Sequence, residues 1–585
     1  MEKIYSRIRN FKLPKRDEIN EAIAYFSKKE WIVFIGLLAI LLLSTLAILQ
    51  SVNRYFMVSV PTYGGSFSEG IIGTPRFINP VLANSPADQD LVSLVYSGLM
   101  RKNSDGDIVP DLAEKYEVSK DGLNYTFTLK DKIYFQNEDP ITVDDIIFTI
   151  NEVKDTAINS PHRIEWAGVS VTKIDDKTIQ FTLRQPYPLF LENATLGIMP
   201  ASIWKDSPIE LNAANTSPIG SGPYMIKNSA KESSGAINSF ELTSFDKFAL
   251  GKPYINTISL HFYSNEDDSI KGLEGGEVEQ ISSITPLNAD ILKERNYLID
   301  SFILPRIFGL FFNQNQNQIF TDKVVVRAID QAIDKEKIVQ EVLFGYGVPI
   351  DGPIPPNLVP YQKLTTRENS PSRENIIKNV QSSLAKDGWI KGDDNFLQKT
   401  TTGKDKRKQT TSLAFSISTG NTPDLLRAAE IIKQELEEVG IKVNIKTFEV
   451  GNLNQGVIRP RSYDALLFGE IVNHESDLYA FWHSSQRNDP GLNVALYTNA
   501  KVDKLLEDAA TTIDNVQRIN KYAQFESEIK KDMPAVFLYS PKFIYVVSNK
   551  IKGVSIGRNT QPTDRFSNVY EWYTKTEDIW KIFTK

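Results

Sequence analysis

The chain has 585 residues, of which 41% are hydrophobic and 24% charged, and its formal net charge is −7. This composition is that of a globular protein and excludes collagen-like, coiled-coil and wholly disordered classes. The chain contains no cysteine, which excludes disulfide frameworks, thiolate zinc sites and cysteine nucleophiles.

The first predicted element is an apolar helix. Residues 31–53 carry no charged side chain, and about 20 such residues span a bilayer. The 30 residues before them carry eight basic and five acidic side chains, and this positive excess favours a cytoplasmic location. A cleavable signal peptide has a shorter apolar region that ends at a small-residue site. We therefore predict a cytoplasmic tail at 1–30, a single-pass anchor in the cell membrane at 31–53, and an extracytoplasmic main domain.

Two segments in the first third of the chain predict strands, because residues 125–129 and 178–183 alternate in polarity behind turn residues. A long helix is predicted over 322–343, where apolar residues recur at helical spacing. A second helix is predicted over 422–440, with Pro423 in its first turn and Gly440 at its end. Residues 441–445 then alternate as a strand, so the second half is expected to be an α/β lobe with a mixed sheet.

Residue patterns that would carry catalysis or bind metal are lacking. The four histidines are scattered, and no H-E-x-x-H, G-x-S-x-G or phosphate-loop motif occurs. The one dense basic run, 404–408, lies in a Thr/Gly/Asp-rich stretch typical of a solvated hairpin tip or loop. The negative net charge argues against nucleic acid as a partner. We therefore expect no catalytic residues, no metal site and no cofactor.

The order of short motifs along the chain is more informative than any one of them. They are GGSFSEG (64–70), FINP (77–80), VYSGL (95–99), DIVPDLA (107–113), DGLNYTFTLK (121–130), PITVDD (140–145), GSGPY (220–224) and VRAIDQAID (326–334). Over about residues 62–550 this series resembles the family-5 extracellular solute-binding proteins, the dipeptide- and oligopeptide-binding receptors of ABC importers.

The resemblance implies an α/β fold of the two-lobed, type II periplasmic-binding-protein kind, with an additional β-rich domain. The expected bounds of the two lobes and of the additional domain follow from the positions of the matching motifs. Lobe I is expected at 62–92, 215–300 and 541–585, the additional domain at 93–214, and lobe II at 301–540. The ligand would lie in the cleft between the lobes, and closure of the lobes would bury it.

The resemblance also implies a set of ligand-binding residues. Its first-lobe members are Ser68, Glu69 and Gly70, on a strand expected to line the cleft. The second-lobe members are Glu470, Ile471, His474, Glu475 and Asp477, followed by the aromatic Trp482.

Two of these positions depart from the family pattern. Peptide-binding members carry a Trp and, three residues later, an Asp that pairs with the ligand amine, whereas this chain has Ile471 and His474 there. A neutral histidine does not supply that negative charge, so ordinary peptide recognition is in question. His474 is equally interpreted as a loop histidine with its own partner, and Trp482 as part of the lobe core.

The expected function is that of a membrane-anchored receptor that captures a short peptide, or a related small polar ligand, and delivers it to the permease subunits of an ABC importer. It catalyses no reaction. The alternative is a ligand-sensing or scaffold protein that uses the same fold without transport.

Overall fold

The structure of the protein is a computed structural model, which describes residues 15–356, 358, 371–402, 408–555, 557 and 559–584. The chain divides into two compact units, one formed by Met1–Thr62 with Lys575–Lys585 and the other by Tyr63–Thr574. Most of the expected basic hairpin tip, residues 404–407, lies outside the described residues, as do residues 1–14 of the expected tail.

The smaller unit is built on one long helix, α3 (Lys28–Phe56), preceded by α2 (Arg16–Ala24). Ser27 begins α3 with a capping box, because its side chain accepts the N–H of Glu30 while the Glu30 carboxylate accepts the N–H of Ser27. Among the residues that the structure describes, only α3 is long and apolar enough to cross a bilayer. Strand β1 (Met57–Thr62) follows α3 directly and pairs antiparallel with β23 (Lys575–Trp580).

A mixed sheet of 12 strands organises the larger unit, and its main path runs β20-β19-β21-β14-β22-β12-β2-β11-β10-β9. Strand β22 belongs to both halves of this sheet, because its first part pairs with β14 and its last part with β13. The strands are β2 (Ser66–Ile72), β9 (Tyr224–Lys231), β10 (Ile237–Ser244), β11 (Thr257–Tyr263), β12 (Gln280–Ser282), β13 (Leu298–Ile303), β14 (Arg306–Phe312), β15 (Gly347–Pro349), β19 (Ala414–Gly420), β20 (Lys442–Phe448), β21 (Ala465–Ile471) and β22 (Ala535–Val547).

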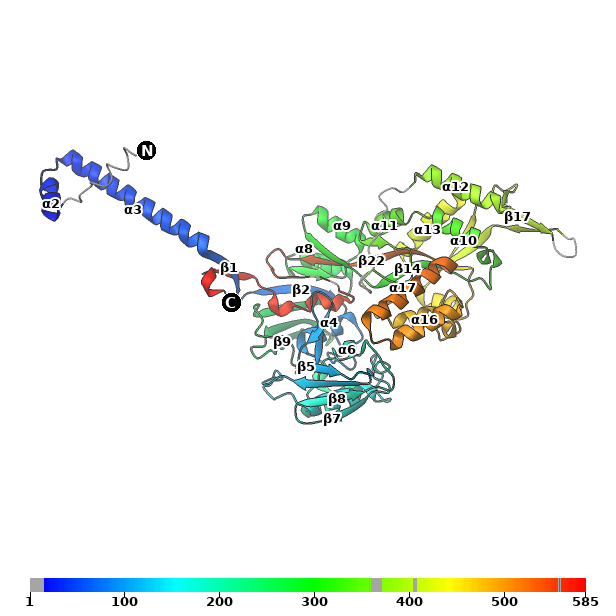
Figure 1. The fold of residues 1–585 in the computed structure, drawn as a ribbon, viewed down its shortest axis with the longest axis horizontal. Coiled ribbons are helices and arrows are strands. Elements are labelled where there is room, and N and C mark those ends of the chain that lie inside the picture. The colour runs from blue at the N-terminus through cyan, green and yellow to red at the C-terminus, as the bar shows by residue number, and fades with distance from the viewer. Residues whose placement is uncertain are drawn as a thin grey trace. The chain divides into compact units, whose positions relative to one another are not determined.

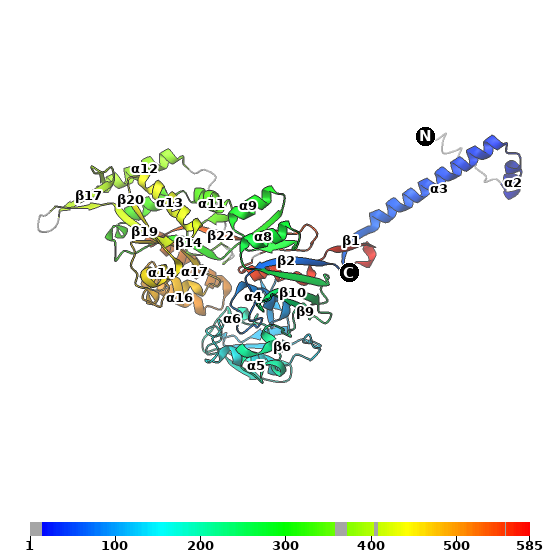
Figure 2. The ribbon, with the colours of Figure 1, turned by 180° about the vertical axis from the view of Figure 1, so that it is seen from behind.

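Helices cover both faces of the sheet half formed by β19–β21 and β14, as Figures 1 and 2 show. Side chains of β14 alternate between two buried clusters, with Leu310 and Phe312 in one and Ile307 and Phe311 in the other. The mixed α/β arrangement predicted for this half is thereby confirmed. The helices of the first cluster are α10 (Lys323–Ala332), α11 (Lys335–Leu343), α12 (Arg373–Lys386) and α13 (Pro423–Glu438), and those of the second include α15 (Asp477–Trp482), α16 (Ala500–Thr511) and α17 (Asn515–Asp532).

The single helix predicted over 322–343 is wrong, because the segment forms two helices. Ile333 and Asp334 separate α10 from α11, and the Asp334 carboxylate accepts the N–H of Lys337 as the N-cap of α11. The helix predicted over 422–440 is confirmed as α13, with Pro423 in its first turn.

A β-rich part follows α4 (Pro86–Val95) in the chain. Its main sheet is antiparallel, in the order β5-β6-β8-β7, and the predicted strands are two of its members. Phe127 and Phe181 face a core that continues into the β2–β11 half of the large sheet. The elements of this part are β3 (Met100–Lys102), β4 (Ile108–Pro110), β5 (Ala113–Val118), β6 (Asn124–Leu129), α5 (Val143–Lys154), β7 (Ser170–Lys173), β8 (Thr178–Thr182), α6 (Phe190–Asn193) and α7 (Ala201–Trp204).

The remaining elements are short. Strands β16 (Ile390–Lys391), β17 (Leu397–Thr402) and β18 (Lys408–Ser412) form a three-stranded antiparallel sheet, from which β17 and β18 project (Figure 1). Helices α8 (Glu266–Glu274) and α9 (Pro286–Glu294) pack beside β2, β12 and β13, and α14 (Val450–Leu453) packs near β19. The 3₁₀ and π turns are η1 (Ile209–Leu211), η2 (Ala213–Asn215), η3 (Gln318–Thr321), η4 (Asn454–Ile458), η5 (Ser484–Gln486), η6 (Pro562–Phe566), η7 (Val569–Glu571) and η8 (Lys581–Phe583).

Candidate ligand-binding site

A cavity of about 1390 Å³ lies in the larger unit. Its walls come from parts of the chain that are far apart in sequence, mainly the β-rich part with the neighbouring α4, the β21–α15 segment and the segment around η6. Arg306 of β14 and Arg518 of α17 also line it. Sites for drug-sized ligands are typically about 300–1,000 Å³, so this cavity has room for a ligand of several residues together with water.

Four of the nine predicted site residues line this cavity, namely Ile471, His474, Glu475 and Asp477. They lie where β21 ends and α15 begins. The backbone N–H of His474 donates to the Asp477 carboxylate at 2.9 Å and shapes the connecting turn. Burial raises the pKa of Asp477, although the backbone N–H of His474 opposes that shift.

His474 contacts Glu192 of α6 through its Nδ1 atom, and so joins the β-rich part to the β21–α15 segment. Burial alone lowers the pKa of His474, but the hydrogen bond and charge of Glu192, helped by Asp477 and Glu165, leave it above its ordinary value of 6.5. His474 therefore has its own partner, as the loop-histidine interpretation expected. The same side chain also lines the cavity. The sequence carries no signal for this pair, because 282 positions separate the two residues.

The contact between His474 and Glu192 should be sensitive to pH. A histidine whose pKa is raised on folding contributes its full stabilisation below about pH 6.5, and loses it as the pH rises through the raised value. Glu192→Gln should therefore lower the melting temperature most at acidic pH and least at alkaline pH, in melts from about pH 5 to about pH 9. Glu232→Gln, at an exposed glutamate elsewhere, serves as the control. A loss that does not change with pH would contradict this account.

Glu475 is neutralised by a buried partner. Its carboxylate accepts a hydrogen bond from Nε of Arg518 on α17 at 2.9 Å, and both side chains are about 10% exposed. Burial raises the pKa of Glu475, and the charge of Arg518 opposes the rise. Both residues line the cavity, so at Glu475 the wall presents an ion pair.

Arg306, the first residue of β14, also lines the cavity and was not predicted as a site residue. It lies beside Ile471 in the β14–β21 register and is half-buried. Within the described part of the chain, no hydrogen bond or ion pair engages its guanidinium, and burial lowers its pKa. A half-buried, unpaired guanidinium facing a cavity is suited to bind a carboxylate with two parallel hydrogen bonds.

The predicted first-lobe residues lie on β2, outside the cavity lining. Glu69 is 0% exposed and accepts hydrogen bonds from Arg565 Nη2 at 2.8 Å and from the Tyr545 hydroxyl at 2.6 Å. Arg565 also binds Asp90, so two carboxylates share one buried cation. Ser68 accepts the N–H of Glu279, and Gly70 packs against the Tyr263 ring.

The two remaining predicted residues are also buried away from the cavity. Neither carboxylate oxygen of Glu470 on β21 has a hydrogen-bond partner in the described chain, and burial raises the pKa of this residue well above its ordinary value. Trp482 is 1% exposed and packs against Phe311 and Phe537. Trp482 is therefore a core residue, which was the alternative interpretation of this position.

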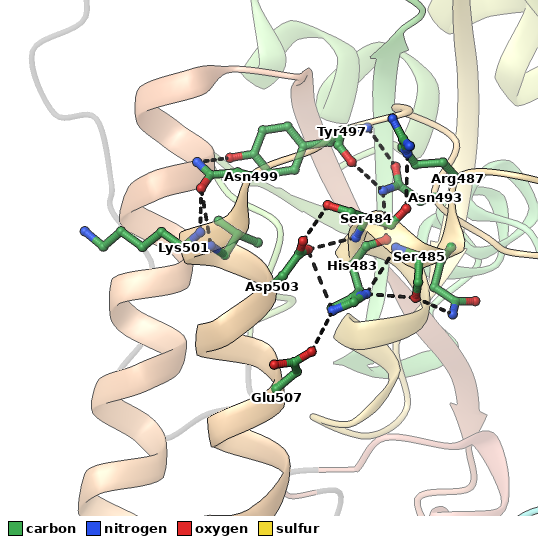
Figure 3. Close-up of polar contacts among 12 residues, drawn as sticks. His483, Ser484, Ser485, Arg487, Asn493, Tyr497, Asn499, Lys501, Asp503 and Glu507 are labelled. Carbon is green, nitrogen blue, oxygen red and sulfur yellow. Dashed lines mark hydrogen bonds and ion pairs between the residues drawn. The ribbon is translucent and has the colours of Figure 1, made fainter.

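A second polar cluster surrounds His483, and its side chains converge in Figure 3. Nδ1 of His483 accepts the backbone N–H of Ser485 at 3.1 Å and lies 2.8 Å from the Ser485 hydroxyl. Nε2 lies 3.3 Å from Glu507, while Asp503 accepts the N–H and hydroxyl of Ser484. A catalytic base would use the unprotonated ring nitrogen, and in His483 this nitrogen, Nδ1, already accepts the N–H that it caps. We therefore interpret this cluster as structural.

Groups of three or more His, Asp or Glu side chains arranged to hold a metal ion do not occur among the described residues. Two ion pairs lie among the charged groups that line the cavity, His474 with Glu192 and Glu475 with Arg518.

Known proteins that are similar to this chain include ligand-binding proteins. A model of bacterial extracellular solute-binding proteins, family 5, matches residues 107–490. The oligopeptide-binding protein AppA of Bacillus subtilis is 27% identical over 530 residues, which cover 88% of this chain and 92% of the relative.

Solved structures resemble the fold over most of the chain. The structure of AppA from Bacillus subtilis in complex with a nonapeptide has a TM-score of 0.62 and 25% identity, and covers 88% of this chain and 100% of that one. NikZ from Campylobacter jejuni, in complex with Ni(L-His), has a TM-score of 0.65 and 24% identity, with 87% and 99% covered. The predicted two-lobed type II fold is confirmed by these similarities.

Proposed function

The chain belongs to family 5 of the bacterial extracellular solute-binding proteins, and we infer from this that it captures a short peptide, or a related small polar ligand, in the cavity described above. It delivers the ligand unaltered to the permease subunits of an ABC importer and performs no catalysis. The observation that carries this proposal is the cavity itself, whose walls come from the β-rich part, the β21–α15 segment and the segment around η6.

We assign lobe I to residues 62–92, 215–300 and 541–585, except that Lys575–Trp580 pairs with β1 in the smaller unit. The additional domain takes 93–214 and lobe II takes 301–540. In this division the Glu192–His474 pair links the additional domain to lobe II. A ligand bound between the additional domain and lobe II would contact both at once. Its binding would therefore favour the state in which the two parts are held together.

The proposed ligand contacts are Ile471, His474, Glu475, Asp477 and Arg306. Arg306 is assigned to a ligand carboxylate, because its charge has no partner within the described chain. A ligand amine is assigned to Asp477, because this carboxylate lines the cavity and forms no salt bridge among the described residues, whereas Glu192 already engages His474. This arrangement suits a zwitterionic ligand such as a short peptide.

The anchor is assigned to α3, with the N-terminus in the cytoplasm and the main domain outside. Tethering the receptor in the membrane of its permease raises the local concentration of each for the other. Copurification of permease subunits with the full chain supports transport, whereas capture of an unrelated regulator alone would support the sensing alternative.

A panel of short peptides tests the binding function. A peptide that binds should stabilise the protein by about 2.7 kcal/mol when it is present at about 100 times its Kd. Calorimetric melting measures this effect, and mass spectrometry of the released peptide should show an unchanged mass. Stabilisation by no peptide or small polar solute, or recovery of cleaved products, would contradict the proposal.

A further inference from the structure

The C-terminal segment lies at the outer end of α3, and the pairing of two strands brings it there. β23 runs antiparallel to β1, so its last residue, Trp580, is opposite Met57, the residue that follows α3. The chain beyond Trp580 therefore continues toward the last turn of α3. It forms η8 (Lys581–Phe583) at that level.

Direct contacts hold this arrangement within the smaller unit. The Trp580 indole N–H donates to the Asn53 side-chain oxygen at 2.8 Å, and the Trp580 ring stacks on Phe56 with centroids 6.2 Å apart. Tyr55 meets Phe56 edge to face at 5.2 Å. Three aromatic rings thus gather at the end of α3.

Large apolar side chains at this end are exposed to an unusual degree. Ile582 is 76% exposed, Phe583 72% and Tyr55 78%. These side chains continue the apolar surface of α3, none of whose side chains is buried. Arg54 and Lys581 place positive charge beside them.

We propose that the segment Trp580–Phe583 is a second membrane contact, which inserts into the interface of the bilayer beside the exit of α3. An apolar and aromatic surface with basic side chains, located where a spanning helix leaves the hydrocarbon, fits the headgroup region of an anionic membrane. With α3, this segment gives the smaller unit two points of contact with the bilayer. This inference rests on the proposed role of α3 as an anchor.

Depth measurements on the full chain test the inference. Because the chain contains no cysteine, single substitutions to cysteine accept one fluorescent label each. The labelled positions are Ile582→Cys in η8, Tyr55→Cys on α3 as the interface benchmark, Leu41→Cys in mid-helix, and Thr576→Cys on β23 as the matched control. The protein is reconstituted in vesicles of phosphatidylcholine and phosphatidylglycerol that carry quenchers at shallow or deep positions.

The expected result is that shallow quenchers reduce emission at Ile582→Cys as strongly as at Tyr55→Cys and leave Thr576→Cys unaffected, while deep quenchers act at Leu41→Cys. Quenching at Leu41→Cys without quenching at Ile582→Cys overturns the second contact and leaves the anchor intact. Lack of quenching at Leu41→Cys overturns the anchor and the second contact together.

Discussion

Replacement of Arg565 by methionine should lower the free energy of unfolding by roughly 3–5 kcal/mol, the cost of breaking a buried ion pair from one side. Arg565 is fully buried and binds Glu69 and Asp90 with hydrogen bonds of 2.6–2.9 Å. Removing it leaves two carboxylates in the core with no cation between them. The charges of both carboxylates raise the pKa of Arg565 despite its burial, which agrees with a cation essential to this cluster.

Urea denaturation of the wild-type and Arg565→Met proteins measures this effect. Arg459→Met is the matched control, because its pair with Asp489 is exposed and should contribute no more than about 1 kcal/mol. Arg565→Lys keeps the positive charge and should recover part of the loss. An unchanged midpoint for Arg565→Met would show that the cluster does not stabilise the fold.

Replacement of Arg306 by glutamine should weaken the binding of a peptide with a free carboxylate by about 1.5–3 kcal/mol, roughly 10- to 150-fold, which is typical for a hydrogen bond to a charged group. The side chain lines the cavity and is half-buried, so its charge is poorly solvated until a carboxylate binds. The stability of the unliganded protein should change little, because no described residue pairs with this guanidinium.

Calorimetric titration of each variant with a bound peptide and with its C-terminally amidated form separates the roles. The wild type should prefer the free acid, and Arg306→Gln should bind both forms alike. Arg459→Gln, which lies outside the cavity lining, should retain the preference. An equal loss for both peptide forms in Arg306→Gln would assign Arg306 to a general packing role.

The sequence was sufficient to predict elements whose signals are local. The apolar spacing and the end residues of 422–440 identify α13, and the alternation at 125–129 identifies β6. The break between α10 and α11 was missed because residues on both sides keep helical spacing, while Asp334 acts as a cap that competes with a continuous helix.

The site was less predictable because its pairs join distant parts of the chain. The turn from β21 to α15 was identified by resemblance, and four of its residues line the cavity. Glu192 and Arg518 carry no sequence signal, since their importance depends on contacts with His474 and Glu475 that only the fold creates. Glu69 has its arginine partner 496 positions later, so the sequence does not distinguish a buried ion pair from a ligand-facing carboxylate.

In the proposed complex, the ligand occupies the cavity between the β-rich part and the β21–α15 segment. Hydrogen exchange of the full chain, with and without a stabilising peptide, tests it most directly. Amide exchange should be slower at Ile471–Asp477 and around Glu192 in the complex, and unchanged in the His483 cluster. Protection confined to other regions, with exchange at Ile471–Asp477 unaffected, would contradict it.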